Sequence, residues 1–365
     1  MDIVKVFFET EKKLKILGHK EPALVFIKEN GQKVSYSWGE YRRQALYAAS
    51  AISGKENFIG IISLNLPESF FALLGIILAG ATPVPINHFL LKNARGREEL
   101  KLILSNCKPK IVLANRGIVE ESAKNKVNIN GIREPEFFTI EEFLETGKRI
   151  FEKKLNGRFY CKEKKGGDLL IMPCTSGSSG NPKGVMLSHE NIIDRAEAVT
   201  KELNVGPEDR ILSYLPMGHI SELIASFFGQ ITAGYTVYFT EYSRDREELK
   251  KHFPKVLKEV RPTVFLAVPK VWKNLRAGVE KKTKSLKIWL LRKILPDADS
   301  FIRRKVKEGL GFSQTKVFVS AASYLNPKDM EFFAGLDIKI RDIYGQTEVA
   351  GPLLIDGKPN AKSKS

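Results

Sequence analysis

Short runs of β-branched and aromatic residues alternate with helical patterns along most of this chain. The runs lie at residues 57–63, 110–114, 210–214, 236–240, 263–268, 316–320 and 339–343. Helical patterns intervene, most clearly at residues 67–79, 98–106, 220–231, 246–260 and 327–334. A crossover between parallel strands needs a connection of helix length, so this alternation favours parallel sheets covered by helices. The sequence therefore predicts an α/β fold, and its 365 residues suit two stacked α/β halves better than one sheet.

The longest apolar stretch, residues 70–86, is interrupted by glycine and proline and is too short to span a bilayer. We expect a buried helix that begins at Pro67 and ends at Gly80, followed by a turn. The start of the chain shows no secretory signal pattern. The cysteines are three, an odd number, so together with the missing signal pattern we expect a cytoplasmic protein with reduced thiols. The three cysteines and five histidines lack metal-ligand spacing, so no transition-metal site is expected.

The net charge of +17 favours acidic partners, namely a nucleotide, coenzyme A, an anionic membrane surface or nucleic acid. Much of the charge is local, because residues 270–308 hold 13 Lys or Arg against 4 Asp or Glu. Peripheral contact with an anionic membrane is one interpretation of this segment, and an ordinary solvated basic face is the other. No motif that reads RNA or DNA is present, so we expect no nucleic-acid partner.

The most informative segment is residues 169–189, LLIMPCTSGSSGNPKGVMLSH. A hydrophobic run enters a loop rich in glycine and hydroxyl groups, and a helix follows with Ser188 as its expected N-cap. Glycines let backbone N–H groups approach an anion, hydroxyls add donors, and Lys183 adds a positive charge. The loop is not a Walker A motif, because a proline precedes the lysine and a glycine follows it. A loop without function could also be rich in glycine and serine, but the entering strand and the lysine favour a phosphate site.

This string resembles the signature loop of the adenylate-forming superfamily, which includes acyl-CoA synthetases, luciferases and peptide-synthetase adenylation domains. The resemblance implies that the loop holds the β- and γ-phosphates of ATP and that Lys183 acts in catalysis. The implied phosphate-binding residues are Thr175, Ser176, Gly177, Ser178, Ser179, Gly180 and Lys183. The implied fold is the large domain of that superfamily, over residues 1–355, with a frayed tail at 356–365.

Residues 341–348, RDIYGQTE, resemble the second core motif of the same superfamily. Alone, this string would equally suit a plain turn after a strand, in which Gly345 supplies backbone freedom. The resemblance implies that Thr347 hydrogen-bonds the α-phosphate and that Glu348 binds Mg²⁺, for which carboxylate oxygen is a suitable ligand. The other nucleotide-site residues implied by this motif are Asp342 and Tyr344, both toward adenine, with Gly345 and Gln346.

Further segments match the superfamily. Residues 320–323 resemble the small-residue loop along adenine, where the superfamily more often has glycine than Ala321 and Ala322. Residues 214–222, YLPMGHISE, resemble the segment whose histidine lines the carboxylate pocket, so His219 is implied to steer the acyl carboxylate. A histidine satisfied at a helix start is an equal alternative. Residues 72–87 resemble a structural core segment that ends in a turn.

Residues 264–275, VFLAVPKVWKNL, are similar to a stretch of long-chain fatty acyl-CoA synthetases. The resemblance implies a fatty acid–CoA ligase that forms an acyl-adenylate from Mg-ATP and then transfers the acyl group to coenzyme A. The alternatives are an enzyme that loads a carrier protein or adenylates another carboxylate, and a non-catalytic nucleotide-binding module. The superfamily's later Thr-Gly-Asp motif, hinge and small C-terminal domain do not follow residue 348. We therefore expect the large domain of a longer enzyme, nearly inactive by itself.

Overall fold

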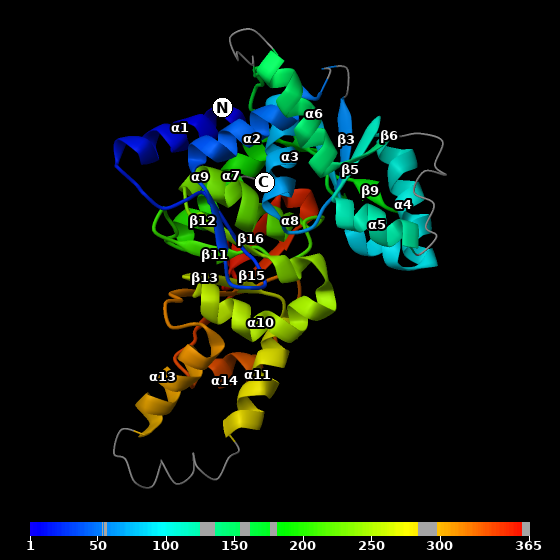
Figure 1. The fold of residues 1–365 in the computed structure, drawn as a ribbon. Helices are drawn as coiled ribbons and strands as arrows, with labels where there is room; N and C mark the ends of the chain where they lie inside the picture. Colours follow the sequence, from blue (N-terminus) through cyan, green and yellow to red (C-terminus); the bar gives the residue numbers. More distant parts are fainter. Residues whose placement is uncertain are drawn as a thin grey trace.

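A computed structural model describes residues 1–52, 54, 57–124, 136–153, 161–175, 181–283 and 298–359. Within these residues, a nine-stranded and a four-stranded sheet form the framework (Figure 1), and two short antiparallel ladders complete it. Most strand pairs in the two large sheets are parallel, and helices pack on the faces of both. The predicted α/β class and the pair of helix-covered sheets are therefore confirmed.

The nine-stranded sheet has a parallel centre and antiparallel edges. Its strands, in spatial order, are β17 (Lys358–Pro359), β16 (Gly351–Ile355), β15 (Ile340–Gln346), β14 (Val317–Ser320), β13 (Val264–Ala267), β11 (Arg210–Leu212), β12 (Thr236–Thr240), β1 (Leu24–Ile27) and β2 (Lys33–Tyr36). The strands from β15 to β1 run parallel, whereas β2, β16 and β17 pair antiparallel with their neighbours. The carboxyl ends of the central strands therefore share one edge.

The four-stranded sheet is parallel throughout. Its order is β4 (Thr82–Ile86), β3 (Phe58–Ile62), β5 (Ile111–Ala114) and β6 (Glu136–Thr139). The turn expected after Gly80 was wrong, because this segment is the fully buried strand β4. Pro83 and Pro85 cannot donate ladder hydrogen bonds, and the edge position of β4 in its sheet tolerates them.

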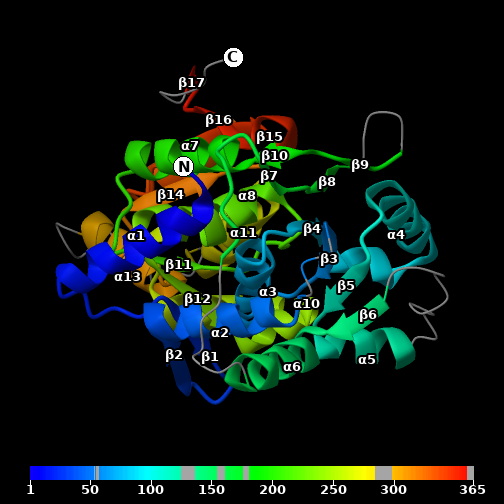
Figure 2. The same ribbon diagram turned by 90° about the horizontal axis from the view of Figure 1, so that it is seen from above.

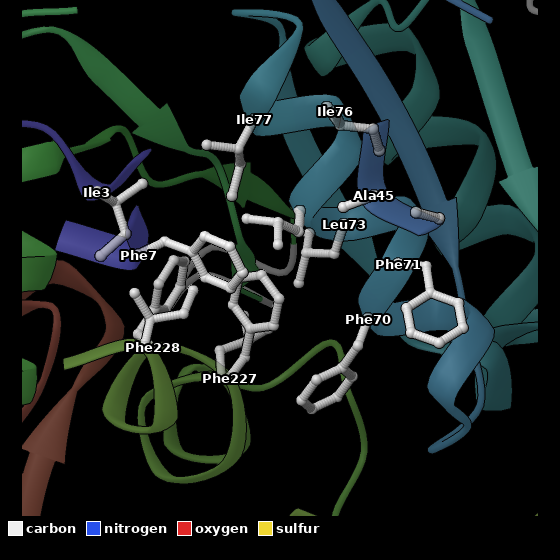
Figure 3. Close-up of a cluster of buried hydrophobic side chains, with 14 of the residues drawn as sticks. Ile3, Phe7, Ala45, Phe70, Phe71, Leu73, Ile76, Ile77, Phe227 and Phe228 are labelled. Carbon is white, nitrogen blue, oxygen red and sulfur yellow. The ribbon is translucent and has the colours of Figure 1, made fainter. Parts of the chain in front are cut away.

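Helix α3 (Pro67–Leu78) lies in the core that joins the two sheets, and every residue in it except Glu68 is buried. It begins at Pro67, as predicted, because proline needs no hydrogen-bond acceptor in the first helical turn. Figure 3 shows Phe70 and Leu73 of α3 near Phe227 and Phe228, with Phe7 from α1 (Ile3–Ile16) close by. The ring centroids of Phe70 and Phe227 are 5.2 Å apart in an edge-on arrangement.

The remaining helices cover the sheet faces. They are α2 (Trp38–Ser50), α4 (Ala94–Cys107), α5 (Arg116–Lys124), α6 (Ile140–Lys153), α7 (His189–Glu202), α8 (Ile220–Glu222), the π-helix η3 (Leu223–Phe228), α9 (Gly229–Ala233), α10 (Arg246–Val260), α11 (Pro269–Thr283), α13 (Ala298–Leu310) and α14 (Pro327–Ala334). A second core, between the large sheet and α10, α11 and α14, centres on the buried Trp272. The indole N–H of Trp272 donates to the Val319 carbonyl at 3.2 Å, so its polar atom is satisfied.

The sequence predicted a frayed tail at 356–365, but the first residues of this segment are ordered. Residues 356–357 form a turn, and β17 then pairs with β16. The turn is held because the Asp356 carboxylate accepts the Asp342 backbone N–H at 2.9 Å and pairs with Arg341. Residues 360–365 lie outside the described part. Among the described helices, none is both long and apolar enough to cross a membrane.

Candidate active site

A cavity of about 780 Å³ lies at the carboxyl ends of strands from both large sheets. Its wall includes Asn65 after β3, His88 after β4, Tyr214 after β11, Val268 after β13 and Ala321 at the end of β14. In open α/β sheets this edge is where ligands bind, because loops with free polar groups gather there. The cavity is therefore the first candidate for an active site.

Six of the residues predicted from sequence line this cavity. They are His219, Ala321, Ala322, Gly345, Gln346 and Thr347. They come from three separate segments, which the parallel strands β11, β14 and β15 bring to one edge. Ala322 has a φ of 76°, a left-handed conformation that glycine adopts more readily than alanine. The backbone here thus has the shape that a glycine would favour, although the residue is alanine.

An apolar wall faces the same cavity. Leu249 and Phe253 lie one turn apart on α10, and Val271 and Leu275 lie one turn apart on α11, so each pair shares a helix face. The Tyr214 ring lies 4.9 Å from the Phe253 ring, and its hydroxyl donates to the Leu266 carbonyl at 2.8 Å. The tyrosine therefore presents mainly its apolar ring to this side.

Basic residues also line the cavity, namely Arg246, Lys250 and Lys270. All three are exposed, and the Arg246 guanidinium lies 4.7 Å from the centre of the Phe89 ring. Lys250 is paired with Glu247 on the same helix. Positive charge beside an apolar wall suits a ligand that has both an acidic group and a hydrocarbon part.

The turn after β15 depends on a close approach between two strands. A Cβ atom on Gly345 would lie 2.1 Å from the Gly351 carbonyl oxygen, so no larger residue fits there without a shift. The alternative of a plain turn in which Gly345 supplies backbone freedom is not supported, because the φ of Gly345 is not positive and close packing against β16 explains the glycine. Gln346 follows, and its side-chain amide donates to the Tyr344 hydroxyl at 2.8 Å, which orients an exposed ring.

His219 begins α8 but makes no side-chain capping hydrogen bond, so the alternative of a histidine satisfied at a helix start is not supported. Its side chain is accessible from the cavity, yet the surrounding protein lowers its pKa by desolvation. The imidazole is therefore mainly neutral at pH 7. A neutral imidazole can donate one hydrogen bond and accept another.

A buried network supports the turn that carries His219. The Glu222 carboxylate accepts hydrogen bonds from the Ser213 hydroxyl at 2.5 Å and from the Asn65 amide at 3.2 Å. The same Asn65 amide donates to the Leu215 carbonyl at 2.8 Å. Burial raises the pKa of Glu222 to about 7, although the hydrogen bonds oppose the shift. Sequence reasoning gave Glu222 no role, because a carboxylate at a helix start gives no sign of burial.

His88 is a second histidine in the cavity wall that sequence reasoning did not select. Burial, together with the positive charges of Lys92 and Arg246, lowers its pKa to about 4, so it is neutral at pH 7. Its Nδ1 atom is buried and has no hydrogen-bond partner among the described residues. A histidine two residues after a strand is the signal that could have identified it, but that strand was expected to be a turn.

The glycine-rich loop lies within a β-hairpin. Strand β8 (Cys174–Thr175) pairs antiparallel with β9 (Lys183–Gly184), so Thr175 and Lys183 lie opposite each other at its base. Lys183 is exposed and Thr175 is half-buried. The other predicted phosphate-binding residues, Ser176, Gly177, Ser178, Ser179 and Gly180, lie outside the described residues.

The chain leaves this hairpin through another short strand before the next helix. β10 (Leu187–Ser188) pairs with β7 (Leu169–Ile171), the strand that enters the loop. Ser188 then caps α7, as predicted, through a capping box with Asn191. The N-terminus of α7 is therefore separated from the loop by two strands, which agrees with the absence of a Walker A motif.

The remaining predicted residues do not line the cavity within the described part of the chain. They are Thr175, Lys183, Asp342, Tyr344 and Glu348. Glu348 lies in the 3₁₀ turn η5 (Thr347–Val349), directly after cavity residue Thr347, and its carboxylate is exposed. Burial and the nearby Asp356 carboxylate raise the pKa of Asp342.

Solved structures of adenylating enzymes share this arrangement. The fatty acyl-adenylate ligase from L. pneumophila, solved with acyl adenylate and pyrophosphate, has a TM-score of 0.68 and 19% identity, over 97% of this chain and 57% of that one. McyG A-PCP, solved with phenylalanyl-adenylate, has a TM-score of 0.73 and 14% identity, over 100% of this chain and 53% of that one. The fold is thus that of the large domain of adenylate-forming enzymes.

Sequence comparison gives the family. The sequence model of the AMP-binding enzyme family matches residues 17–365, and the chain belongs to this family. Among its relatives is the human long-chain-fatty-acid–CoA ligase ACSBG2, which is 30% identical over 382 residues. That match covers 93% of this chain and 55% of the human protein, so the chain spans about half the length of such a relative.

Proposed function

We propose that this chain is the nucleotide- and acyl-binding part of an AMP-forming long-chain fatty acid–CoA ligase. In the first step, a fatty acid carboxylate attacks the α-phosphate of Mg-ATP and releases pyrophosphate. In the second, the thiol of coenzyme A attacks the acyl-adenylate and releases AMP. One observation carries the proposal, namely that the turn with Thr347 and an apolar wall of α10 and α11 line the same cavity.

Under this proposal the polar residues divide by the part of ATP that they contact. Thr347 and His219 lie nearest the reacting groups, where Thr347 hydrogen-bonds the α-phosphate and His219 orients the carboxylate. Lys183 and the hairpin loop hold the β- and γ-phosphates. Adenine lies along Ala321 and Ala322 beside Tyr344, with Asp342 accepting from its amino group.

Glu348 suits the magnesium ion that accompanies ATP. Its carboxylate is exposed and makes no hydrogen bond or ion pair within the described part of the chain. Carboxylate oxygen is a ligand that Mg²⁺ prefers, and the ion commonly uses one or two carboxylates together with phosphate oxygens. When bound, the ion offsets negative charge on the phosphates.

The apolar wall supports a fatty acyl group rather than a small acid. Each buried methylene contributes roughly 0.8 kcal/mol, so eight further methylenes contribute about 6 kcal/mol if they are all enclosed. The cavity volume of about 780 Å³ lies within the roughly 300–1,000 Å³ that is usual for ligand pockets. Similarity to the human long-chain-fatty-acid–CoA ligase supports the same substrate class.

Calorimetric titration with stable acetyl-, octanoyl- and palmitoyl-adenylate analogues tests the proposal. We expect affinity to rise with chain length, because the longer chains cover more of the apolar wall. Equal affinity for all three analogues would retain the adenylate site and contradict the long-chain substrate. Absence of binding of all three analogues would contradict the adenylate site itself.

A carrier protein is the alternative acceptor, and the similarity to McyG A-PCP, solved with phenylalanyl-adenylate, favours testing it. Product formation that requires coenzyme A would support the ligase. Product formation with a phosphopantetheinyl carrier protein and not with coenzyme A would support the alternative. A non-catalytic nucleotide-binding module would bind ATP without forming acyl-adenylate.

We also propose a cytoplasmic location with peripheral contact to anionic membranes. Helices α11 and α13 extend together from the large sheet (Figure 1) and carry much of the basic segment at 270–308. Part of this charge is neutralised, because Arg276 pairs with Asp329 and Lys305 pairs with Glu308. Binding to phosphatidylserine vesicles that disappears in high salt would support the contact, and equal binding to neutral vesicles would contradict it.

A further inference from the structure

Two cysteine side chains meet beside the glycine-rich hairpin. Cys107 is the last residue of α4, and Cys174 begins β8, directly before Thr175. Their Sγ atoms are 3.6 Å apart, although the residues are 67 positions apart in sequence. Both are free thiols, Cys107 buried and Cys174 half-buried. A disulfide has a sulfur–sulfur distance of about 2.05 Å, so bond formation requires these two sulfur atoms, already in contact, to move closer together.

The hairpin sequence itself makes room for this contact. Gly184 lies directly across from Cys174 in the β8–β9 ladder. A Cβ atom at Gly184 would lie 3.2 Å from the Cys107 sulfur and 2.8 Å from the Met172 sulfur. The glycine after Lys183 therefore leaves the space that Cys107 fills.

A second contact joins the same two elements. The Asn106 side-chain amide donates to the Pro182 carbonyl at 2.9 Å, and α4 and β9 lie side by side (Figure 2). Pro182 directly precedes Lys183. The end of α4 thus packs against both strands of the hairpin that brackets residues 176–180.

The contact also shifts the pKa values of the two thiols in opposite directions. The hydrogen bond between them lowers the pKa of Cys107, although its burial opposes this, and raises the pKa of Cys174. Cys161 is the third cysteine, and burial raises its pKa.

We propose that Cys107 and Cys174 form a reversible disulfide that ties α4 to the hairpin and thereby regulates nucleotide binding. Hydrogen peroxide oxidises one thiol to a sulfenic acid and is reduced to water. The second thiol then displaces a further water, and the sulfur–sulfur bond forms. In total, two thiols and one peroxide give one disulfide and two waters, and a dithiol reductant reverses the bond. The effect on nucleotide rests on the proposed function, whereas formation of the bond does not.

Oxidation of the purified chain with hydrogen peroxide, followed by non-reducing peptide mapping, tests the bond. We expect one disulfide between Cys107 and Cys174, with Cys161 still open to alkylation. Cys107→Ala and Cys174→Ala should each abolish it, and Cys161→Ala, the matched control, should leave it intact. A disulfide that involves Cys161, or three alkylatable thiols after oxidation, would overturn the proposal. Hydrogen exchange provides an independent measurement, since amides of β8 and β9 should exchange more slowly in the oxidised protein.

The regulatory part is tested by titrating ATP into the reduced and oxidised forms. We expect oxidation to weaken binding about fivefold or more, the lower end of ordinary coupling between two sites. Dithiothreitol should restore the affinity, and Cys174→Ala should show no change on oxidation. Equal affinity in both forms would overturn the regulatory role. If the reduced chain binds no ATP while the disulfide still forms and slows exchange, the proposed function fails and the structural effect of the bond stands.

Discussion

Lys183 is the single residue on which the phosphate assignment can be tested most directly. It is exposed at the base of the hairpin and makes no ion pair within the described residues. Lys183→Ala should weaken Mg-ATP binding by about tenfold, because a hydrogen bond to a charged group contributes roughly 1.5–3 kcal/mol. AMP lacks the β- and γ-phosphates, so its affinity should change little. Calorimetry with each nucleotide measures how far the substitution changes its dissociation constant.

Met186 offers a matched control, since it is 71% exposed in the same segment and is apolar. Met186→Ala should leave both affinities as in the wild type. If Lys183→Ala weakens ATP and AMP binding equally, the lysine does not contact the terminal phosphates.

Ala322 allows a second test, of backbone strain, because its φ of 76° is strained for any residue with a Cβ atom. Ala322→Gly should raise the free energy of unfolding by roughly 1 kcal/mol. Ala321 is buried and lacks a positive φ, so Ala321→Gly should lower the free energy of unfolding by about 0.5–1 kcal/mol. Urea denaturation of both variants checks the prediction. A loss of stability at both positions would show that the strain at Ala322 is not relieved by glycine.

Part of this site could be predicted from the sequence, and the rest could not, for physical reasons. His219 and Thr347 stand in strings long enough to resemble known motifs, and both line the cavity. His88 and Glu222 matter through burial, which depends on contacts between segments far apart in sequence. Sequence spacing does not give those contacts, so the burial of these two side chains could not be predicted.

At the scale of elements, the sequence predicted the helices whose ends are marked by residues such as proline and capping side chains. Helix α14 begins at Pro327, as predicted, with Asn326 as its cap, and α10 follows an Asp245 cap. Strand β1 was not predicted, because its pairing with β12 is decided by tertiary contact and not by local pattern. The tail at β17 was missed for the same reason.

The junction between α1 and α7 gives a prediction about pH. The Ile3 backbone N–H donates to the Nδ1 atom of His189, at 3.1 Å, so the hydrogen bond requires a neutral imidazole. Burial lowers the pKa of His189 to about 4, against an ordinary value of about 6.5. As pH falls from 6.5 toward 4, the unfolded chain takes up a proton that the folded chain does not. The free energy of unfolding therefore falls, by up to about 1.4 kcal/mol per pH unit.

His189→Asn should flatten this dependence, since an asparagine oxygen can accept the same hydrogen bond and does not titrate. Urea denaturation at pH 7, 5.5 and 4.5 compares the two proteins. His88 and Glu222 titrate in the same range but are present in both, so they cancel in the difference. An equal pH dependence in wild type and variant would exclude His189 as its source.

At the scale of the whole molecule, the cavity exists because two sheets meet at their carboxyl edges. The sequence predicted two α/β halves but not how they are joined. Gly218 lies in the loop after β11, and Asn87 directly follows β4 of the other sheet. A Cβ atom on Gly218 would lie 2.8 Å from the Asn87 backbone nitrogen and 3.0 Å from its Cα atom. Their neighbours His219 and His88 both line the cavity, so we expect this contact to set the distance between its two walls.

Gly218→Ala should therefore force the two sheets apart where the ligand is proposed to bind. Overpacking of this kind typically lowers the free energy of unfolding by about 1–3 kcal/mol, and binding of an acyl-adenylate analogue should weaken as well. Gly278, in α11, has open space where a Cβ would lie, so Gly278→Ala should raise stability by up to about 1 kcal/mol and leave binding unchanged. Denaturation and calorimetry on the same two variants measure both effects. If Gly218→Ala loses stability but binds the analogue as tightly as wild type, the contact supports the fold and does not set the width of the cavity.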